Sequence, residues 1–232
     1  MKIEQVFRKY MSDQFFQIDM TKKDAGPVIT ISRETGCFAG RIAERLTSKI
    51  NAMNKATGKE DNWNYITKEI LEKVADKLKI KPESVNHIFE AHKTPIMEEL
   101  ANSIFSPHYV SDSMIITTLK NIIKSFAFEG NVVIIGRAAS MITHEIHKSL
   151  HIKLYAPKNF REKNLMEINH ISQKNAKEII KNTDSQRETF IRFFLDKKSE
   201  MEYYDSMINC SRFEEDQIVD MIYFNALEKE LL

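Results

Sequence analysis

The chain has 232 residues and an even charge balance, with 34 Lys and Arg against 33 Asp and Glu and a formal net charge of +1. This length predicts one α/β domain with insertions, and the balance leaves no chain-wide field that would attract nucleic acid or a membrane surface. Any site for a polyanion must therefore be local.

The cysteines and the apolar runs predict a cytoplasmic protein. Cys37 and Cys210 lie far apart, have no CxxC spacing and follow no secretory leader, which favours reduced thiols and argues against structural zinc. No apolar run reaches the ~20 residues that a membrane helix requires. Residues 1–26 mix charges with Phe and Met, and we expect an N-terminal arm or docked helix before a single domain over 27–232.

Short apolar segments separated by helical patterns predict a parallel sheet with crossover helices. The expected strands cover residues 27–33, 63–66, 131–136, 150–156 and 206–211. After the first strand, apolar residues at helical spacing predict an amphipathic helix that packs on the sheet. These residues are Ile42, Ala43, Leu46, Ile50 and Met53.

The two longest connections predict helical insertions. Residues 67–130 carry prolines that interrupt their helical pattern, so this crossover predicts several helices rather than one. Residues 158–202 predict a second insertion, with one helix capped by Ser172 and another from about Ser185. A last helix is expected over about 213–231.

The stretch "VITISRETGCFAGRIAERL" over residues 28–46 runs from a strand pattern through two glycines into a helix pattern. Such a turn directs backbone N–H groups and the positive end of the helix dipole at one point, which favours an anion. Gly36 and Gly40 permit a close approach of phosphate, and Arg41 could add a charge-assisted contact. The loop lacks the Lys and hydroxyl of GxxxxGK[ST], so a plain strand-to-helix connection is the alternative.

Several separated motifs together resemble the cytidylate kinase-like family of P-loop nucleoside monophosphate kinases. In order they are "ITISRETG" with "IAERL", "VVIIGRAAS", "HIKLYAPKNFREKNLMEI" with "KNTDSQRETFIRFFL", and "YDSMINCSRF". The resemblance covers about residues 27–224. It implies a three-layer fold with a five-stranded parallel sheet in the order 2-3-1-4-5, an acceptor-binding insertion at about 67–130 and a lid at about 158–202.

The resemblance also assigns a phosphate-binding loop that departs from the family pattern. Relatives have a run like "SREYGSGGREIA", where this chain has "SRETGCFAGRIA", so that Phe38 and Ala39 replace two glycines. A Phe and an Ala restrict the approach of backbone to phosphate unless Arg41 supplies the missing charge. The expected phosphate-binding residues are Arg33, Gly36, Cys37, Phe38, Ala39, Gly40 and Arg41.

Arginines outside the loop are candidates for the chemistry of phosphoryl transfer, which needs alignment and neutralisation of charge. Arg137 follows the third strand at the edge of the sheet where open α/β folds bind ligands. The resemblance makes Arg187 and Arg192 lid arginines with a catalytic role, and places Arg161 and Asp184 in the lid or at the substrate. For Asp184, capping of the helix that carries Arg187 is an equal alternative.

The resemblance implies transfer of the γ-phosphoryl group of ATP, with Mg²⁺, to a nucleoside monophosphate, with CMP or dCMP first. The acceptor region departs from the family, since Ile66 or Thr67 replaces the expected Asp near Tyr65. Two alternatives stay open: a non-catalytic nucleotide- or anion-binding protein with a degenerate loop, and a kinase of another small acceptor. Nucleotides are the expected partners, without nucleic acid or membrane.

Overall fold

A computed structural model of the chain describes residues 25–67, 112–195 and 199–232. The expectation of an N-terminal arm therefore falls, except for its last two residues, outside the described residues. So does most of the acceptor-binding insertion expected over 67–130.

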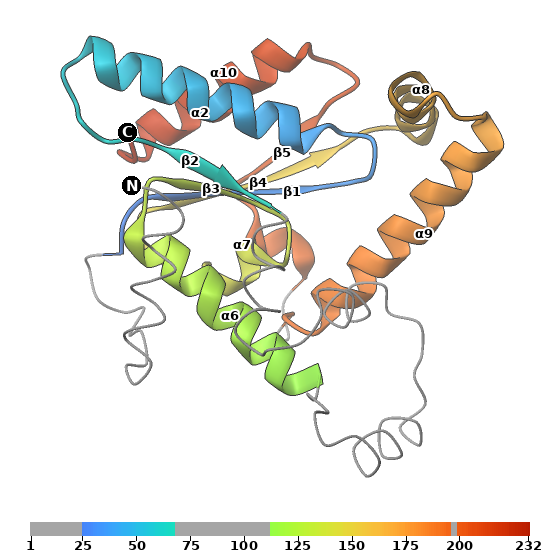
Figure 1. Ribbon diagram of the computed structural model, residues 1–232, viewed down its shortest axis with the longest axis horizontal. Coiled ribbons are helices and arrows are strands. Elements are labelled where there is room, and N and C mark those ends of the chain that lie inside the picture. The colour runs from blue at the N-terminus through green and yellow to red at the C-terminus, as the bar shows by residue number, and fades with distance from the viewer. Residues whose placement is uncertain (1–24, 68–111, 196–198) are drawn as a thin grey trace.

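Five parallel strands form one sheet in the order β2-β3-β1-β4-β5 (Figure 1). Their bounds are β1 Val28–Arg33, β2 Asn64–Ile66, β3 Val132–Ile135, β4 Ser149–Tyr155 and β5 Ser206–Asn209. The fold class and strand order expected from the sequence are confirmed, and each strand lies within or one residue beyond its expected segment. Because all strands are parallel, their carboxyl ends meet at one edge of the sheet.

The central strand β1 is apolar and β-branched because it is covered on both faces. Val28, Ile29 and Ile31 are fully buried, and β1 pairs with β3 on one side and β4 on the other. The strand ends with Ser32 and Arg33, which are only partly buried. Polar residues thus begin where the sheet reaches its carboxyl edge.

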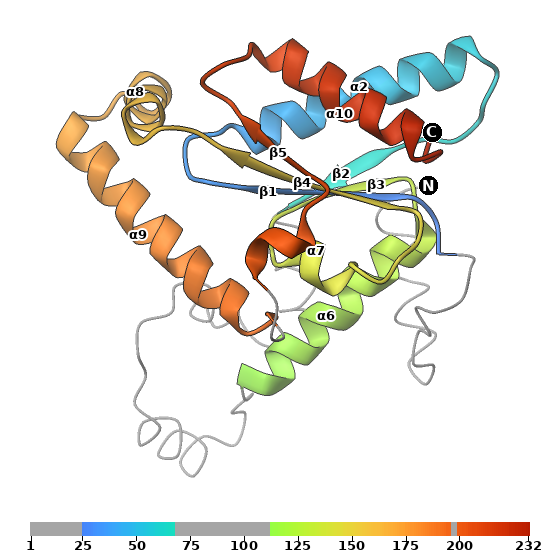
Figure 2. The ribbon, with the colours of Figure 1, turned by 180° about the vertical axis from the view of Figure 1, so that it is seen from behind.

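One face of the sheet is covered by helices α2 (Ala39–Ala56) and α10 (Glu215–Glu228) (Figures 1 and 2). The apolar stripe expected for α2 packs inward at Ile42, Leu46 and Ile50, each no more than 1% exposed. Met53 is 44% exposed, so this member of the expected stripe does not join the core, whereas the neighbouring Asn54 is 7% exposed. Ile218 and Ile222 of α10 join this core.

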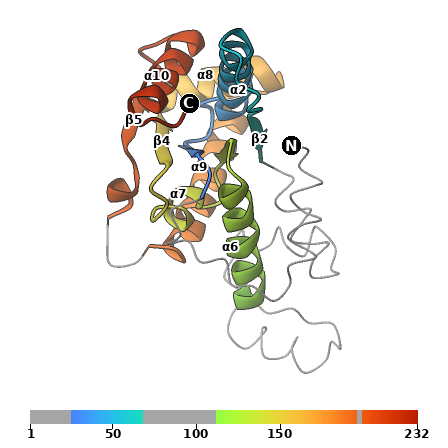
Figure 3. The same ribbon diagram turned by 90° about the vertical axis from the view of Figure 1, so that its left-hand side faces the viewer.

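The opposite face carries α6 (Asp112–Glu129) and the short α7 (Ala139–Ile142) (Figure 3). Ile115, Leu119 and Ile122 of α6 are almost fully buried against this face. The chain therefore has three layers, with an apolar core on each side of the sheet. None of the helices in the described ranges is both long and apolar enough to cross a membrane.

The second insertion consists of α8 (Lys158–Asn169), α9 (Gln173–Arg192) and a 3₁₀ helix, η1 (Glu200–Tyr203), and it lies at the carboxyl edge of the sheet (Figure 1). Ser172 caps α9, as expected: its side chain accepts a hydrogen bond from the Asn175 N–H. The expectation of a new helix from about Ser185 is wrong, because α9 continues through that position. Asp184 therefore caps no helix.

A buried histidine sits in β4 and is held neutral by its surroundings. Ser149 Oγ donates to the Ile146 carbonyl and so accepts from His151 Nε2 at 3.0 Å, which leaves Nδ1 to accept from Thr30 Oγ1 at 2.8 Å. Burial lowers the pKa of His151 to about 4, against a smaller opposing effect of Asp205. Protonation of this ring is thus more favourable in the unfolded chain than in the folded one.

We expect the free energy of unfolding to fall as pH drops from about 6.5 towards 4. In this range His151 becomes protonated in the unfolded chain but stays neutral in the folded one. The loss attributable to this residue is about 2 kcal/mol between pH 7 and pH 5. Urea unfolding at the two pH values measures it. The exposed His147 supplies a control, since His147→Gln keeps this dependence and His151→Gln removes it. Equal wild-type stabilities at pH 7 and pH 5 would contradict the assignment.

Candidate phosphate-binding site

The connection between β1 and α2, residues 34–38, is the loop that the sequence marks for phosphate. Gly36 (φ 95°) and Phe38 (φ 49°) both adopt left-handed backbone, and α2 begins directly after Phe38. Among the described residues, nothing accepts a hydrogen bond from the backbone N–H groups at positions 38–41. These donors at a helix N-terminus have the polarity that an anion requires.

Arg161 of α8 holds the loop in place through its guanidinium. Its Nε donates to the Ala156 carbonyl at 3.0 Å and its Nη1 to the Thr35 carbonyl at 3.2 Å. The same guanidinium pairs with Asp184 at 2.6 Å and Glu34 at 3.2 Å, and its side chain is only 10% exposed. Arg161 therefore acts as an internal brace: it holds the loop by hydrogen bonds, and its guanidinium is already paired with the carboxylates of Asp184 and Glu34.

Asp184 reaches the loop as well, from the middle of α9. One carboxylate oxygen accepts the backbone N–H of Thr35 at 2.8 Å, while the other holds Arg161. The carboxylate thus fixes the loop by a charge-assisted hydrogen bond. The capping role considered from the sequence is replaced by a cross-link between α9 and the loop.

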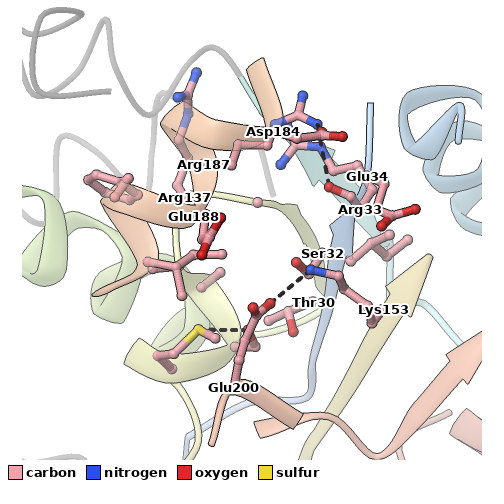
Figure 4. A pocket seen from close by; sticks show the side chains of 18 residues that line it. Thr30, Ser32, Arg33, Glu34, Arg137, Lys153, Asp184, Arg187, Glu188 and Glu200 are labelled. Atoms are coloured by element: carbon pink, nitrogen blue, oxygen red, sulfur yellow. Dashed lines mark hydrogen bonds and ion pairs between the residues drawn. The ribbon is translucent and has the colours of Figure 1, made fainter. Parts of the chain in front are cut away.

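Three arginines that are distant in sequence converge above the carboxyl ends of β1 and β3. Arg33 ends β1, Arg137 follows β3 and Arg187 extends from α9, and all three line one cavity of about 250 Å³ (Figure 4). Arg187 Nη1 donates to Thr35 Oγ1 at 2.8 Å and lies 3.6 Å from Asp184. No described residue accepts a hydrogen bond from the guanidinium of Arg33.

The proximity of these cations contributes to lowering their pKa values. Burial, and then repulsion by Arg187 and Arg137, hold the pKa of Arg33 well below its usual value. Burial followed by repulsion from Arg187 lowers the pKa of Arg137 to about 10. Burial also lowers the pKa of Arg187, with Asp184 opposing. Three partly desolvated cations repel one another, so a bound polyanion would relieve an unfavourable charge distribution.

The turn after β3 makes room for Arg33. Gly136, Arg137 and Ala138 all have left-handed backbone, with φ of 70°, 58° and 54°. A Cβ on Gly136 would overlap the Arg33 guanidinium. Left-handed backbone is unfavourable for Arg and Ala and recurs where function holds a loop in place. The glycine is thus required both by its φ and by the arginine packed on it.

Gly136→Ala is expected to displace Arg33 and, if the cavity holds phosphate, to weaken the binding of inorganic pyrophosphate at least tenfold, measured by calorimetry. Backbone strain alone costs about 1–2 kcal/mol at a left-handed residue, so a matched variant is needed. Gly58 has a φ of 74° and open space around it, so Gly58→Ala introduces the strain without the overlap and should keep wild-type affinity. Equal affinities in the two variants would contradict the role given to Gly136.

Two of the arginines expected at the site point elsewhere. Arg41 is 49% exposed, pairs with Glu215 of α10 at 2.5 Å and stacks on the Phe38 ring with 4.1 Å to its centroid. Arg192 is 68% exposed and pairs with Glu188 one turn earlier in α9 at 2.6 Å. The charge that Arg41 was expected to supply is therefore directed away from the three-arginine cavity.

Polar residues that were not among the expected site residues form another wall of this cavity. Lys153 of β4 donates to Glu200 at 2.8 Å, and the Tyr204 hydroxyl donates to the same carboxylate oxygen at 2.7 Å. The Tyr204 oxygen lies 3.0 Å from Ser32 Oγ. Against the effect of burial, the bonds from Lys153 and Tyr204 lower the pKa of Glu200. A Lys inside the apolar run of β4 was the sequence feature that could have revealed this wall.

A second cavity, of about 440 Å³, lies on the other side of the loop. It is bounded by α8 and by the segment between β5 and α10, with Phe38, Phe160 and Phe213 among its aromatic residues. Arg41 and Arg212 also line it. The loop thus separates a cationic cavity from one with aromatic walls.

The oxygen donors beside the loop fit a Mg²⁺ ion that arrives on nucleotide phosphates. Such an ion takes one or two protein oxygens and completes its shell with phosphates and water. Ser32 and Glu34 offer such oxygens at the end of β1, on the wall of the cationic cavity. Within the ranges that the structure describes, no group of three or more His, Cys, Asp or Glu side chains could hold a metal ion by itself.

Comparisons with known proteins bear on the fold and on the family. A crystal structure of an uncharacterized protein from Eubacterium ventriosum ATCC 27560 has a TM-score of 0.61 and 23% identity, over 87% of this chain and 98% of that one, which shows a shared fold. Shikimate kinase from Bacteroides thetaiotaomicron reaches a TM-score of 0.45 and 11% identity, over 84% of this chain and 96% of its own. No curated protein sequence matches. The model of the cytidylate kinase-like family matches residues 28–212, and the chain therefore belongs to that family.

Proposed function

We propose that this protein transfers the γ-phosphoryl group of ATP to a nucleoside monophosphate. The observation that carries the proposal is the convergence of Arg33, Arg137 and Arg187 on one cavity beside the β1–α2 loop. Phosphoryl transfer needs little from a protein beyond alignment of donor and acceptor and neutralisation of charge on the migrating group. Three guanidiniums in one cavity meet the second requirement.

The loop and the arginines would divide the work. Backbone N–H groups at positions 38–41 would hold the phosphates of the donor, while the guanidiniums of Arg33, Arg137 and Arg187 would neutralise the oxygens of the phosphoryl group as it moves. An oxygen of the acceptor phosphate attacks the γ-phosphorus, the bond from that phosphorus to the β-phosphate oxygen breaks, and ADP leaves. Mg²⁺, when bound, would be held in part by oxygens of Ser32 and Glu34 and would add neutralising charge for the phosphates.

The two cavities suggest where each substrate lies. We assign the nucleoside of ATP to the cavity of about 440 Å³, whose rings at Phe160 and Phe213 suit a flat base. The acceptor would enter the cationic cavity, where the Lys153–Glu200 pair can accept and donate hydrogen bonds. Membership of the cytidylate kinase-like family favours CMP or dCMP as that acceptor.

One specific observation favours a second candidate, a nucleotide- or anion-binding protein without catalysis. Phe38 occupies a left-handed position that suits glycine, and Arg41 is engaged in a stack on its ring and a pair with Glu215. Asp184 already takes the Thr35 N–H. A loop fixed in this way could retain a phosphate without guiding its transfer.

The two candidates are separated by a thermal-shift panel of nucleotides with Mg²⁺, followed by product detection for every stabilising pair. A ligand at 100 times its Kd stabilises a protein by about 2.7 kcal/mol, a readily measured change in melting temperature. The kinase proposal expects stabilisation by ATP and by CMP or dCMP, with ADP and the nucleoside diphosphate as products. Stabilisation without product would support the binding protein instead, and no stabilisation by any nucleotide would overturn both the kinase and a nucleotide-binding protein.

A further inference from the structure

The two cysteines of the chain, far apart in sequence, meet at the loop. Cys37 lies in the β1–α2 loop and Cys210 directly follows β5, where its N–H donates to the Tyr155 carbonyl at 2.8 Å. The side chains are hydrogen-bonded to each other, and the residues are 1% and 6% exposed. Both also line the cavity of about 440 Å³. A small reagent that enters this cavity reaches two adjacent thiols.

The pKa values of the two thiols shift in opposite directions. The hydrogen bond between the two thiols, together with burial, raises the pKa of Cys37, so its thiol keeps its proton. The same bond lowers the pKa of Cys210, against the effects of burial, Glu34 and Glu215. Arg161 is the nearby cation that favours ionisation of Cys37, and its effect is the smallest of those acting there. Cys210 is thus the sulfur that ionises first and reacts as a nucleophile.

We propose that Cys37 and Cys210 form an oxidisable dithiol that a peroxide closes into an intrachain disulfide, and that this bond weakens phosphate binding at the loop. The Cys210 thiolate attacks one peroxide oxygen, the O–O bond breaks, and the sulfur becomes a sulfenic acid as hydroxide leaves and takes up a proton. Cys37 sulfur then attacks Cys210 sulfur, the S–O bond breaks, and water leaves with the Cys37 proton. Two thiols and one hydrogen peroxide give one disulfide and two waters.

The disulfide would change the conformation of the loop because Cys37 directly precedes the backbone N–H donors at positions 38–41. A disulfide requires the two sulfurs to approach to about 2.05 Å with a specific dihedral angle. Cys210 is held by the sheet through Tyr155, so the loop is the part that moves. The oxidation does not depend on the proposed function, whereas the effect on binding rests on the loop's role as a phosphate site.

Peptide mapping tests the covalent step. The full chain is incubated with hydrogen peroxide, free thiols are blocked with N-ethylmaleimide, and the unreduced digest is analysed by mass spectrometry. The expected result is a cross-linked peptide pair containing Cys37 and Cys210 that dithiothreitol separates. Two alkylated thiols after oxidation, or a disulfide that joins two chains, would overturn the proposal.

The single variants test the order of attack. Cys37→Ser is expected to accumulate a sulfenic acid at Cys210 that dimedone traps, because the resolving thiol is gone. Cys210→Ser is expected to give no cross-link and little dimedone adduct. The reverse pattern, with the adduct at Cys37, would contradict the assignment of Cys210 as nucleophile. The mapping of wild-type protein decides the main point even where a variant folds poorly.

Inorganic pyrophosphate tests the effect on the loop. We expect the reduced protein to bind it at least threefold more tightly than the oxidised protein by calorimetry, and dithiothreitol to restore the difference. Equal affinities before and after oxidation would overturn the regulatory half of the proposal. Absence of binding to the reduced protein would instead count against the proposed function, while leaving the mapped disulfide as it stands.

Discussion

Arg187→Ala is expected to lower kcat/KM for phosphoryl transfer by about 100- to 1,000-fold, the range seen when one preorganised donor to a developing charge is removed. The guanidinium is 30% exposed at its side chain, faces the cavity and donates to the Thr35 hydroxyl. Its charge also depresses the pKa of Arg33 and of Arg137. Removing it relieves that repulsion, so the melting temperature should stay close to that of wild type.

Arg192→Ala is the matched control for this loss. Arg192 stands on the same helix five residues later, is 68% exposed and contacts Glu188. An exposed i,i+4 pair of this kind contributes about 0.3–0.5 kcal/mol, and we expect near wild-type turnover. Equal losses in the two variants, or full activity in Arg187→Ala, would contradict the catalytic role of Arg187.

Arg161→Ala is expected to cost about 1.5–3 kcal/mol of unfolding free energy, because it removes charge-assisted hydrogen bonds from the partly buried carboxylates of Asp184 and Glu34. Asp184 and Glu34 would face each other across the vacated space, and the Thr35 carbonyl would lose its donor. Chemical denaturation measures the loss. Arg161→Lys should recover part of it, since an ammonium keeps the charge but not the fork of donors.

Lys163→Ala tests whether this loss is specific to the brace. Lys163 lies on the same helix, 75% exposed, with Glu167 at 3.7 Å as its ion-pair partner. Surface changes of this kind are usually within about 0.5 kcal/mol of neutral, well below the loss expected for Arg161→Ala. A variant Arg161→Ala that unfolds like wild type and yet fails to bind nucleotide would identify Arg161 as a ligand contact rather than a brace.

The strands were predictable because their local sequence is sufficient to identify them. The buried parallel strand "VVII" is a continuous apolar run and "VITI" departs from one only at Thr30, which is typical of strands covered on both faces. The order of the strands came from the resemblance to the cytidylate kinase-like family, since no local pattern specifies which strands are neighbours. A new helix was wrongly expected at about Ser185 because Asp184 followed by Ser185 is typical of a helix start, whereas here α9 is continuous and Asp184 is held by tertiary contacts.

The site was less predictable than the fold because side-chain direction depends on partners that lie elsewhere in the chain. The sequence indicated Arg33, Arg137 and Arg187, and the structure brings these three together. It gave no means to see that Glu215, 174 positions further on, draws Arg41 away. For the Lys153–Glu200 wall the sequence offered one signal, the Lys inside the apolar run of β4, but not its partner Glu200, which lies in η1 across the cavity.

ATP affinity in the presence of Mg²⁺, measured by calorimetry on a set of single variants, tests the central claim most directly. The set comprises Arg33→Met, Arg137→Met and Arg187→Met, with Arg192→Met as the control. Hydrogen bonds to charged groups contribute about 1.5–3 kcal/mol each, so each of the first three should weaken binding at least tenfold and the control should bind as wild type does. Wild-type affinity in all four variants would contradict the assignment of this cavity to phosphate.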